Sequence, residues 1–226
     1  MTLWDQTLLG LFQKGSFVMW PLLLCSIIGT AVIFERGIYY ARIHLNYEKF
    51  RSDLKSLLQK GDLPEVQKFC RKKANPIPRL TDCYLKHLHD DALRNDILKR
   101  EGSFALEKIE TRLRVLAALT HITPILGLLG TVTGLVGAFH QIELLGGQVQ
   151  PADLAGGIWE ALITTVFGLI IAIPCMAAYH GFESIADRVS RRMQFVVSEL
   201  DEFFSKHSVT EKLKADSSAQ AMNMVQ

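Results

Sequence analysis

Four side chains that could move an ion stand inside two long apolar stretches of this sequence. Thr131 lies in one stretch, and Glu160, Thr164 and Thr165 lie in the other. A carboxylate in an apolar helix is costly unless it faces water, a cavity or a partner. Together with the hydroxyls, it predicts a polar path for ions. Two plainer interpretations stay open: Glu160 snorkels to the interface, and the threonines bond carbonyls of their own helix.

Glycine recurs in the same two stretches at helical spacing. Gly127, Gly130, Gly134 and Gly137 are three, four and three residues apart, so they share one helix face with Thr131. Small residues let helix backbones approach closely in lipid. This face therefore predicts tight helix packing, either within one subunit or around a pore. The residues expected to shape this packing are the four glycines together with Gly168, Pro124 and Pro174.

Three apolar runs are long enough to place these residues inside a membrane. A bilayer core needs about 20 helical residues, and the runs cover 17–34, 115–139 and 158–179. Glu160 is the only Asp, Glu, Lys or Arg within them. A soluble protein would need a very large core to bury three such runs. The sequence therefore predicts an all-α membrane protein with three transmembrane helices.

Lysine and arginine predict the orientation of these helices. Of the 25 such residues, 18 lie between Glu35 and Arg114 and six lie after residue 180, whereas 140–157 holds none. Basic segments stay on the cytoplasmic side of a membrane. We therefore expect the middle segment and the C-terminus in the cytoplasm, and the N-terminus facing outward.

This topology divides the chain into eight expected segments. We expect an outward-facing interfacial segment (1–15), a first transmembrane helix (16–36), a cytoplasmic helical domain (37–114), a second transmembrane helix (115–139), a short outward loop (140–157), a third transmembrane helix (158–180), a cytoplasmic helical extension (181–207) and a disordered tail (208–226).

The cytoplasmic part reads as a bundle of helices. Apolar residues at helical spacing lead into the second span and out of the third without a breaker, which predicts two long helices running from the bilayer into the cytoplasm. Gly61 ends an earlier apolar stripe, and Asp62 with Glu65 forms a capping box that starts the next helix. Asn75 and Pro76 break the chain again.

Other chemistry finds no support in the residues. The four cysteines form no C-x-x-C or zinc spacing, so we expect reduced thiols, no metal site and no cofactor. The spans hold no Ser/His, paired-Asp or H-E-x-x-H arrangement, so we expect no enzyme and no catalytic residues. A net charge of +2 gives no reason to expect a nucleic-acid partner. Because no Asp lies in a span, the group that binds the ion is expected on another chain.

Two runs carry a resemblance to a known family. They are G-L-L-G-T-V-T-G at 127–134 and L-A-G-G-I-W-E-A-L-I-T-T-V-F-G-L at 154–169, followed by Ala172-Ile173-Pro174. These runs resemble the ExbB/TolQ family of proton-channel proteins and, more distantly, the flagellar MotA proteins. The first span looks more like ExbB than TolQ, through Val18-Met19-Trp20-Pro21 and Phe34-Glu35-Arg36.

The resemblance implies an assembly. It implies a homopentamer whose second and third spans line a pore, with an ExbD/TolR-like single-span partner inside it that carries a protonatable Asp. Thr131 and Thr165 would then lie beside that Asp, and Glu160 near the outer mouth. Thr164 does not match a position that the family fixes. A TonB/TolA-like protein is the expected third component.

The implied function is a proton-driven motor subunit that energises TonB-type import across the outer membrane. A TolQ-like envelope-constriction motor, a gliding motor and a non-conducting membrane scaffold stay open as alternatives, as does sodium in place of protons. A flagellar stator is less favoured, because it would need a larger cytoplasmic domain and four spans.

Overall fold

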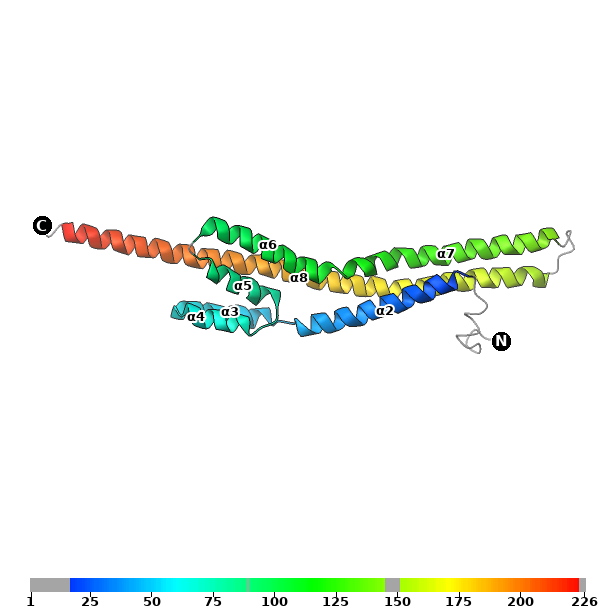
Figure 1. Cartoon of the computed structure of the whole chain (residues 1–226), viewed down its shortest axis with the longest axis horizontal. Helices are drawn as coiled ribbons and strands as arrows, with labels where there is room; N and C mark the ends of the chain where they lie inside the picture. The colour runs from blue at the N-terminus through cyan, green and yellow to red at the C-terminus, as the bar shows by residue number, and fades with distance from the viewer. Residues whose placement is uncertain (1–16, 89, 145–150, 224–226) are drawn as a thin grey trace. The chain divides into compact units, whose positions relative to one another are not determined.

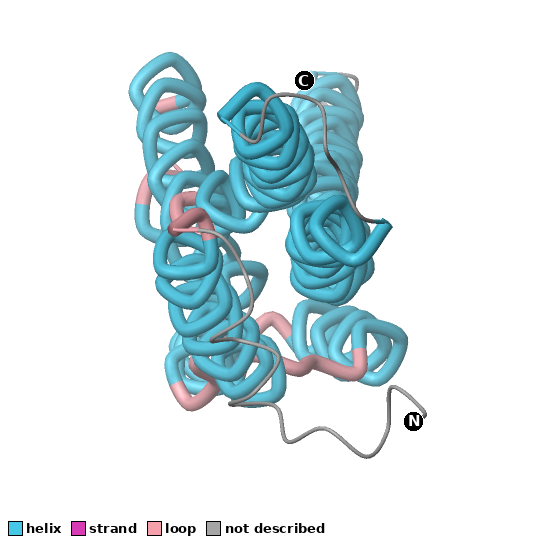
Figure 2. Tube along the Cα trace, turned by 90° about the vertical axis from the view of Figure 1, so that its right-hand side faces the viewer, coloured by secondary structure: helices cyan, strands magenta, loops and turns pink. Residues whose placement is uncertain are grey.

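The described chain is built from helices. The computed structural model describes residues 17–88, 90–144 and 151–223. At Asp91, 151–154 and 207–223 it describes the backbone alone. Within these ranges every regular element is a helix and no strand occurs (Figure 2). The expected interfacial segment at 1–15 lies outside the described residues. The helices are α2 (Met19–Arg42), α3 (Tyr47–Lys60), α4 (Leu63–Arg71), α5 (Pro76–Lys86), α6 (Asp91–Glu110), α7 (Leu113–Leu144) and α8 (Pro151–Asn223).

Two compact units divide these helices. The membrane unit comprises Met1–Tyr40 and Ile109–Ser184, and the second unit comprises Ala41–Lys108 and Ile185–Gln226. Helix α8 contributes to both. In the membrane unit, α2, α7 and the first part of α8 run side by side (Figure 1). Each of these helices contains a segment long and apolar enough to cross a membrane, which confirms the predicted fold class.

The three helices of the membrane unit pack through small and apolar side chains. Val18, Met19 and Leu22 at the start of α2 are buried against partly buried residues of α7 and α8. Further along α2, a Cβ added at Gly29 would lie 2.8 Å from Cys175 Sγ on α8 and 3.3 Å from Leu119 on α7. Helix α2 therefore follows both of the other helices along its length.

The outer surface of the membrane unit is apolar. On α7, Leu128 and Val136 are 60% and 62% exposed, and on α8 Ile173 is 65% exposed. Exposed apolar patches of this extent mark contact with lipid or with another chain. The surface is therefore that of a membrane protein.

The second unit folds around the second part of α8. Its core contains Phe50 of α3, Val66 of α4 and Tyr84 of α5, whose side chains are completely buried. Leu200 of α8 is 1% exposed. Tyr84 donates a hydrogen bond from its hydroxyl to Asp201 Oδ1 at 2.7 Å. Arg51 of α3 pairs with Glu199 of α8. These contacts confirm that this part of the chain forms a helical bundle.

Local sequence signals set where the short helices begin and end. Gly61 terminates α3 with a left-handed φ of 77°. The Asp62 carboxylate accepts from the Glu65 backbone N–H at 3.1 Å, and Asn75 accepts from Ile77 N–H at 2.9 Å. The predicted cap at Asp62 is confirmed, and the predicted break at Asn75 is the start of α5.

The predicted unbroken helix into the second span is wrong. Helix α6 ends at Glu110 and α7 begins at Leu113, with a turn at Thr111 and Arg112. An unbroken helix would direct the carbonyl of Ile109 to the N–H of Leu113. Here that carbonyl accepts from Arg36 Nη1 at 3.2 Å and lies 3.5 Å from the Tyr40 hydroxyl. Side chains of α2 thus satisfy the carbonyl at the break.

Helix α8 is longer than predicted at both ends. It begins at Pro151, inside the segment predicted as an outward loop, and continues to Asn223, through the segment predicted as a disordered tail. Proline is well suited to the first turn of a helix. After Pro174 the only glycine is Gly181 and no further proline follows, so nothing in this sequence breaks the helix. Residues 145–150 of the predicted loop lie outside the described residues.

Candidate functional site

Small residues bring α7 and α8 into close contact. Cβ atoms added at Gly127 and Gly134 would lie 3.1 Å from backbone atoms of α8, and one added at Gly168 would lie 2.7 Å from the Thr123 carbonyl oxygen of α7. Gly130 packs directly on the side chain of Thr164. The two helices are antiparallel, because residues later in α7 meet residues earlier in α8.

Gly137 does not share this contact. Among the described atoms, nothing lies within 4 Å of a Cβ added at Gly137, and the residue is exposed. Ala138 is buried in its place and lies 2.6 Å from a Cβ added at Gly157. Position 138 falls closer than 137 to the middle of the helix face that Gly127 and Gly134 define, because a helix turns 100° per residue.

Thr131 and Thr165 face each other across this contact. Their hydroxyl groups form a hydrogen bond with each other. Thr131 Oγ1 also lies within hydrogen-bond distance of the carbonyl oxygens of Gly127, at 3.2 Å, and Ala161, at 3.3 Å, and Thr165 Oγ1 lies 3.1 Å from that of Gly127. Both residues are half-buried. The structure thus brings together the two threonines that the resemblance placed on the ion path.

Thr164 lies on a different side of α8. Its side chain is completely buried against Gly130. Its hydroxyl donates to the Ala161 carbonyl at 2.8 Å and lies 3.4 Å from the Glu160 carbonyl oxygen. The plainer interpretation, a threonine that bonds carbonyls of its own helix, describes Thr164 well. The geometry gives it a packing role.

The remaining predicted residues lie around this pair. Glu160 is half-buried on α8, about one and a half helical turns before Thr165. Pro124 and Pro174 lie within α7 and α8, where each removes one backbone N–H from the helix. Pro124 follows the fully buried Thr123, whose hydroxyl donates to the Leu119 carbonyl at 2.8 Å.

Sequence reasoning missed a polar network at one end of the membrane unit. Arg36 of α2 is only 5% exposed. Besides reaching the Ile109 carbonyl, its guanidinium lies 3.3 Å from Glu35, which pairs with Arg112 at 2.8 Å. Burial raises the pKa of the neighbouring Tyr40 to about 12. The signal in the sequence was an arginine at the end of an apolar run, but its acceptor is 73 residues away.

The cysteines and acidic groups show no other centre within the described chain. Cys25, Cys70, Cys83 and Cys175 form no disulfide with one another. No group of three or more His, Cys, Asp or Glu side chains suited to a metal occurs among the residues that the structure describes.

Together, three membrane-spanning helices and a glycine-packed pair that holds two threonines define a polytopic membrane protein with a polar contact between its apolar helices. Its family follows from sequence comparison. The MotA/TolQ/ExbB proton channel family matches residues 66–195, more than half of the 226 residues. The chain belongs to this family. The matched range contains every predicted residue of the ion path and of the helix packing.

Individual relatives agree with this assignment. A protein of Synechocystis sp. that bears the name ExbB-like 1 is 31% identical over 200 residues, covering 86% of this chain and 78% of the relative. The biopolymer transport protein exbB1 of Vibrio cholerae is 29% identical over 198 residues, covering 85% and 86%. The Tol-Pal system protein TolQ of Pseudomonas aeruginosa is 38% identical over 86 residues, covering 38% and 37%.

Proposed function

We propose that this chain forms the channel of an inner-membrane motor that converts the proton motive force into mechanical work on the cell envelope. The observation that carries the proposal is the pair of Thr131 and Thr165. Their hydroxyls lie together between two apolar helices of a proton-channel family member. Such a pair can exchange its internal hydrogen bonds for bonds to an ionisable group that enters from a partner.

In this mechanism the ionisable group is an Asp on an ExbD/TolR-like single-span partner. A proton arriving from the periplasm neutralises that Asp, and its helix then moves from one threonine site to the next in a homopentamer. Release of the proton to the cytoplasm restores the charge. The membrane potential supplies about 2.3 kcal/mol per charge per 100 mV, so repeated steps can drive a large movement. Glu160 would lie near the outer mouth.

The charge distribution supports an orientation of the chain in the membrane. The basic middle segment and C-terminus would lie in the cytoplasm and the N-terminus in the periplasm. The alignment covers most of the biopolymer transport protein exbB1 of Vibrio cholerae. This favours a motor that drives biopolymer transport through a TonB-like third component. The shorter match to TolQ supports a Tol-type motor with a TolA-like component as the second candidate.

The test is proton flux through the chain reconstituted in liposomes with its single-span partner. Thr131→Ala and Thr165→Ala should each lower the flux at least tenfold while the assembly stays intact, because each change removes a hydroxyl from the path. Thr133→Ala is the matched control, since its hydroxyl bonds the Leu129 and Gly130 carbonyls of its own helix. Normal flux in both variants would show that the proposed path is wrong and would favour a non-conducting scaffold.

A further inference from the structure

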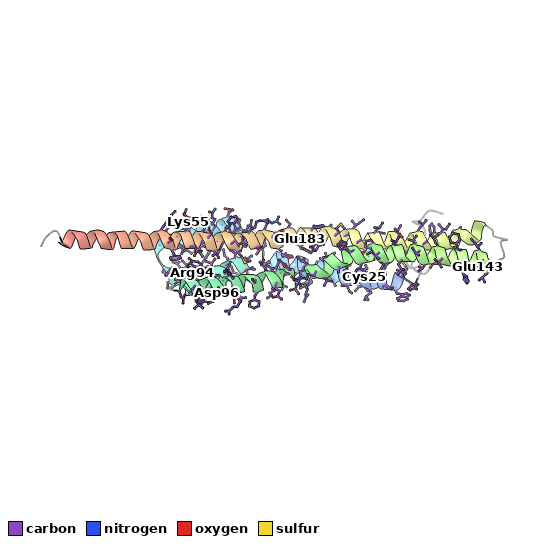
Figure 3. The ribbon with its side chains drawn as sticks, turned by 90° about the horizontal axis from the view of Figure 1, so that it is seen from above. Cys25, Lys55, Arg94, Asp96, Glu143 and Glu183 are labelled. Carbon is purple, nitrogen blue, oxygen red and sulfur yellow. The ribbon has the colours of Figure 1, made fainter. Side chains whose placement is uncertain are left out.

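A second polar cluster lies on α8 at the end of the third span, formed by Tyr179, His180 and Glu183. Glu183, labelled in Figure 3, uses both of its carboxylate oxygens. Oε1 accepts from the Tyr179 hydroxyl at 2.7 Å, and Oε2 lies 3.2 Å from His180 Nδ1. Nothing in the family assignment or in the threonine pair accounts for this cluster.

The cluster shares a face of α8 with Thr165. Glu183 follows Thr165 by 18 residues, which is about five helical turns and about 27 Å. The burial of the side chains agrees with this alignment, because Thr165 and Glu183 are both half-buried. Each follows a residue that faces the other helices, the buried Thr164 and the partly buried Phe182. Both side chains therefore lie at the same edge of the buried face.

The cluster also holds the first bases that a proton would meet on α8. Between Thr165 and Tyr179 the helix carries no Asp, Glu, His, Lys, Arg or Tyr. Cys175 is buried and packs against Gly29 of α2. On α7, His121 is exposed and lies about 80° around the helix from Thr131. On α8, Glu183 is in line with Thr165, and its partners Tyr179 and His180 lie about 40° and 60° to either side of that line.

The hydrogen bonds fix which nitrogen of His180 can act as the base. The bonds from Tyr179 and His180 lower the pKa of the Glu183 carboxyl group, so this group is ionised at neutral pH and can only accept. Nδ1 of His180 must then donate, which leaves the lone pair on Nε2. The His180 side chain is 65% exposed, so Nε2 can exchange a proton with water.

The charged pair of α2 nearest to this level is engaged elsewhere. Tyr40 of α2 stacks on Phe182 with ring centroids 5.1 Å apart, so α2 packs on α8 at this level. The charged groups of that part of α2, Glu35 and Arg36, bond to each other, and Glu35 also bonds Arg112 next to α7. The Glu183 carboxylate bonds to Tyr179 and His180, which both lie on α8 itself.

We propose that His180 accepts the proton that leaves the channel and passes it to the cytoplasm, with Glu183 and Tyr179 holding its ring in the required tautomer. The proposal rests on the proposed function. The O–H bond of the partner's protonated carboxyl group breaks, the proton travels through water, and an N–H bond forms at His180 Nε2. The Nε2–H bond then breaks, and the proton passes to bulk water. Imidazole suits this step because it gains and loses a proton near neutral pH.

Flux in the reconstituted complex tests the proposal. His180→Ala should lower proton flux about tenfold. This is less than the 10²–10⁴-fold range of general base catalysis, because other steps also limit the rate of flux. Imidazole added on the side of the C-terminus should restore flux to this variant. Glu183→Gln should cause a smaller loss, because Nε2 then competes with Nδ1 for the proton. Asp187→Asn is the matched control, since it removes a carboxylate one turn further along α8.

A second measurement reads the tautomer without flux. In an NMR spectrum of the full chain labelled with ¹⁵N-histidine, the His180 signal is identified by its absence from the spectrum of His180→Asn. This signal should show that Nδ1 carries the proton and Nε2 does not. Glu183→Gln should reduce the share of this tautomer. Protonation at Nε2 in the native chain at high pH would overturn the proposal, because Nε2 would then hold no lone pair.

The outcomes separate the two proposals. If the native complex conducts, Thr131→Ala does not, and His180→Ala conducts normally, the role of His180 is wrong and the proposed function stands. If the native complex carries no protons, both fall. Restoration of His180→Ala by imidazole supports a role in proton transfer, because a purely structural histidine would not be replaced by a free base.

Discussion

At the scale of single residues, the closest approach of α7 and α8 depends on having no side chain at a few positions. A Cβ at Gly168 would meet the Thr123 carbonyl oxygen at 2.7 Å and Gly127 Cα at 3.1 Å. Both atoms belong to the backbone and cannot turn away as the end of a side chain can. The threonine pair depends on this approach, because hydroxyl groups reach across helices only when the backbones are close.

Gly168→Ala should therefore destabilise the chain, by about 1–3 kcal/mol for a crowded core position. The measurement is thermal unfolding in detergent, together with proton flux. Gly137→Ala is the control, because a Cβ there meets no described atom within 4 Å. We expect Gly137→Ala to unfold at or slightly above the native temperature, since alanine favours a helix over glycine. Equal unfolding temperatures for the two variants would contradict the packing described for α7 and α8.

At the scale of elements, the break between α6 and α7 is the feature that departs most from the predicted helices. The apolar spacing continues through Ile109, Leu113 and Leu116, so the local pattern favours one helix. Arg36 of α2 competes for the Ile109 carbonyl with a charge-assisted hydrogen bond. A buried guanidinium needs such an acceptor, and the turn at the break provides it.

Arg36→Met keeps much of the apolar stem of Arg36 and removes its hydrogen bonds. We expect a loss of about 1.5–3 kcal/mol, the range for a hydrogen bond to a charged group. Protease cleavage next to Thr111 should also become faster. Arg112→Gln is the control, because that side chain is 55% exposed and pairs only at the surface with Glu35, which contributes about 0–1 kcal/mol. Equal losses in the two variants would mean that Arg36 does not hold the junction.

At the scale of the whole molecule, the exposed apolar surface of the membrane unit exceeds what one chain can cover. Exposed side chains follow α7 from Ile122 to Phe139 and α8 from Leu162 to Met176. Lipid covers some of this surface. Assembly into a ring around the partner helix would cover the rest, and it would place the half-buried threonine pair near a pore.

Native mass spectrometry of the detergent-purified chain, alone and with its single-span partner, measures this assembly. We expect a pentamer that holds two partner chains, as the resemblance implies. A monomer or dimer that ignores the partner would remove the basis for a rotating helix inside a ring. Thr131→Ala should give the same masses as the native chain, which would separate loss of flux from loss of assembly.

The sequence by itself determined the features that depend on near neighbours along the chain. Three apolar runs, the glycine spacing, the caps at Gly61 and Asp62 and the basic segments are all legible at short range, because a helix repeats every 3.6 residues. The runs at 127–134 and 154–169 also carried the family. Even Tyr179, His180 and Glu183 are near neighbours, although only side-chain geometry shows that they bond.

Tertiary structure decided what depends on distant parts of the chain. It brought Thr131 next to Thr165 and buried Thr164 in the helix contact. It also placed Ala138, rather than the predicted Gly137, on the contact face, and it interrupted the helix after Glu110. Each outcome depends on the rotation of one helix against another or on an acceptor far along the chain. Helical periodicity predicts the face of each helix, but the partner of that face is chosen only when the helices pack.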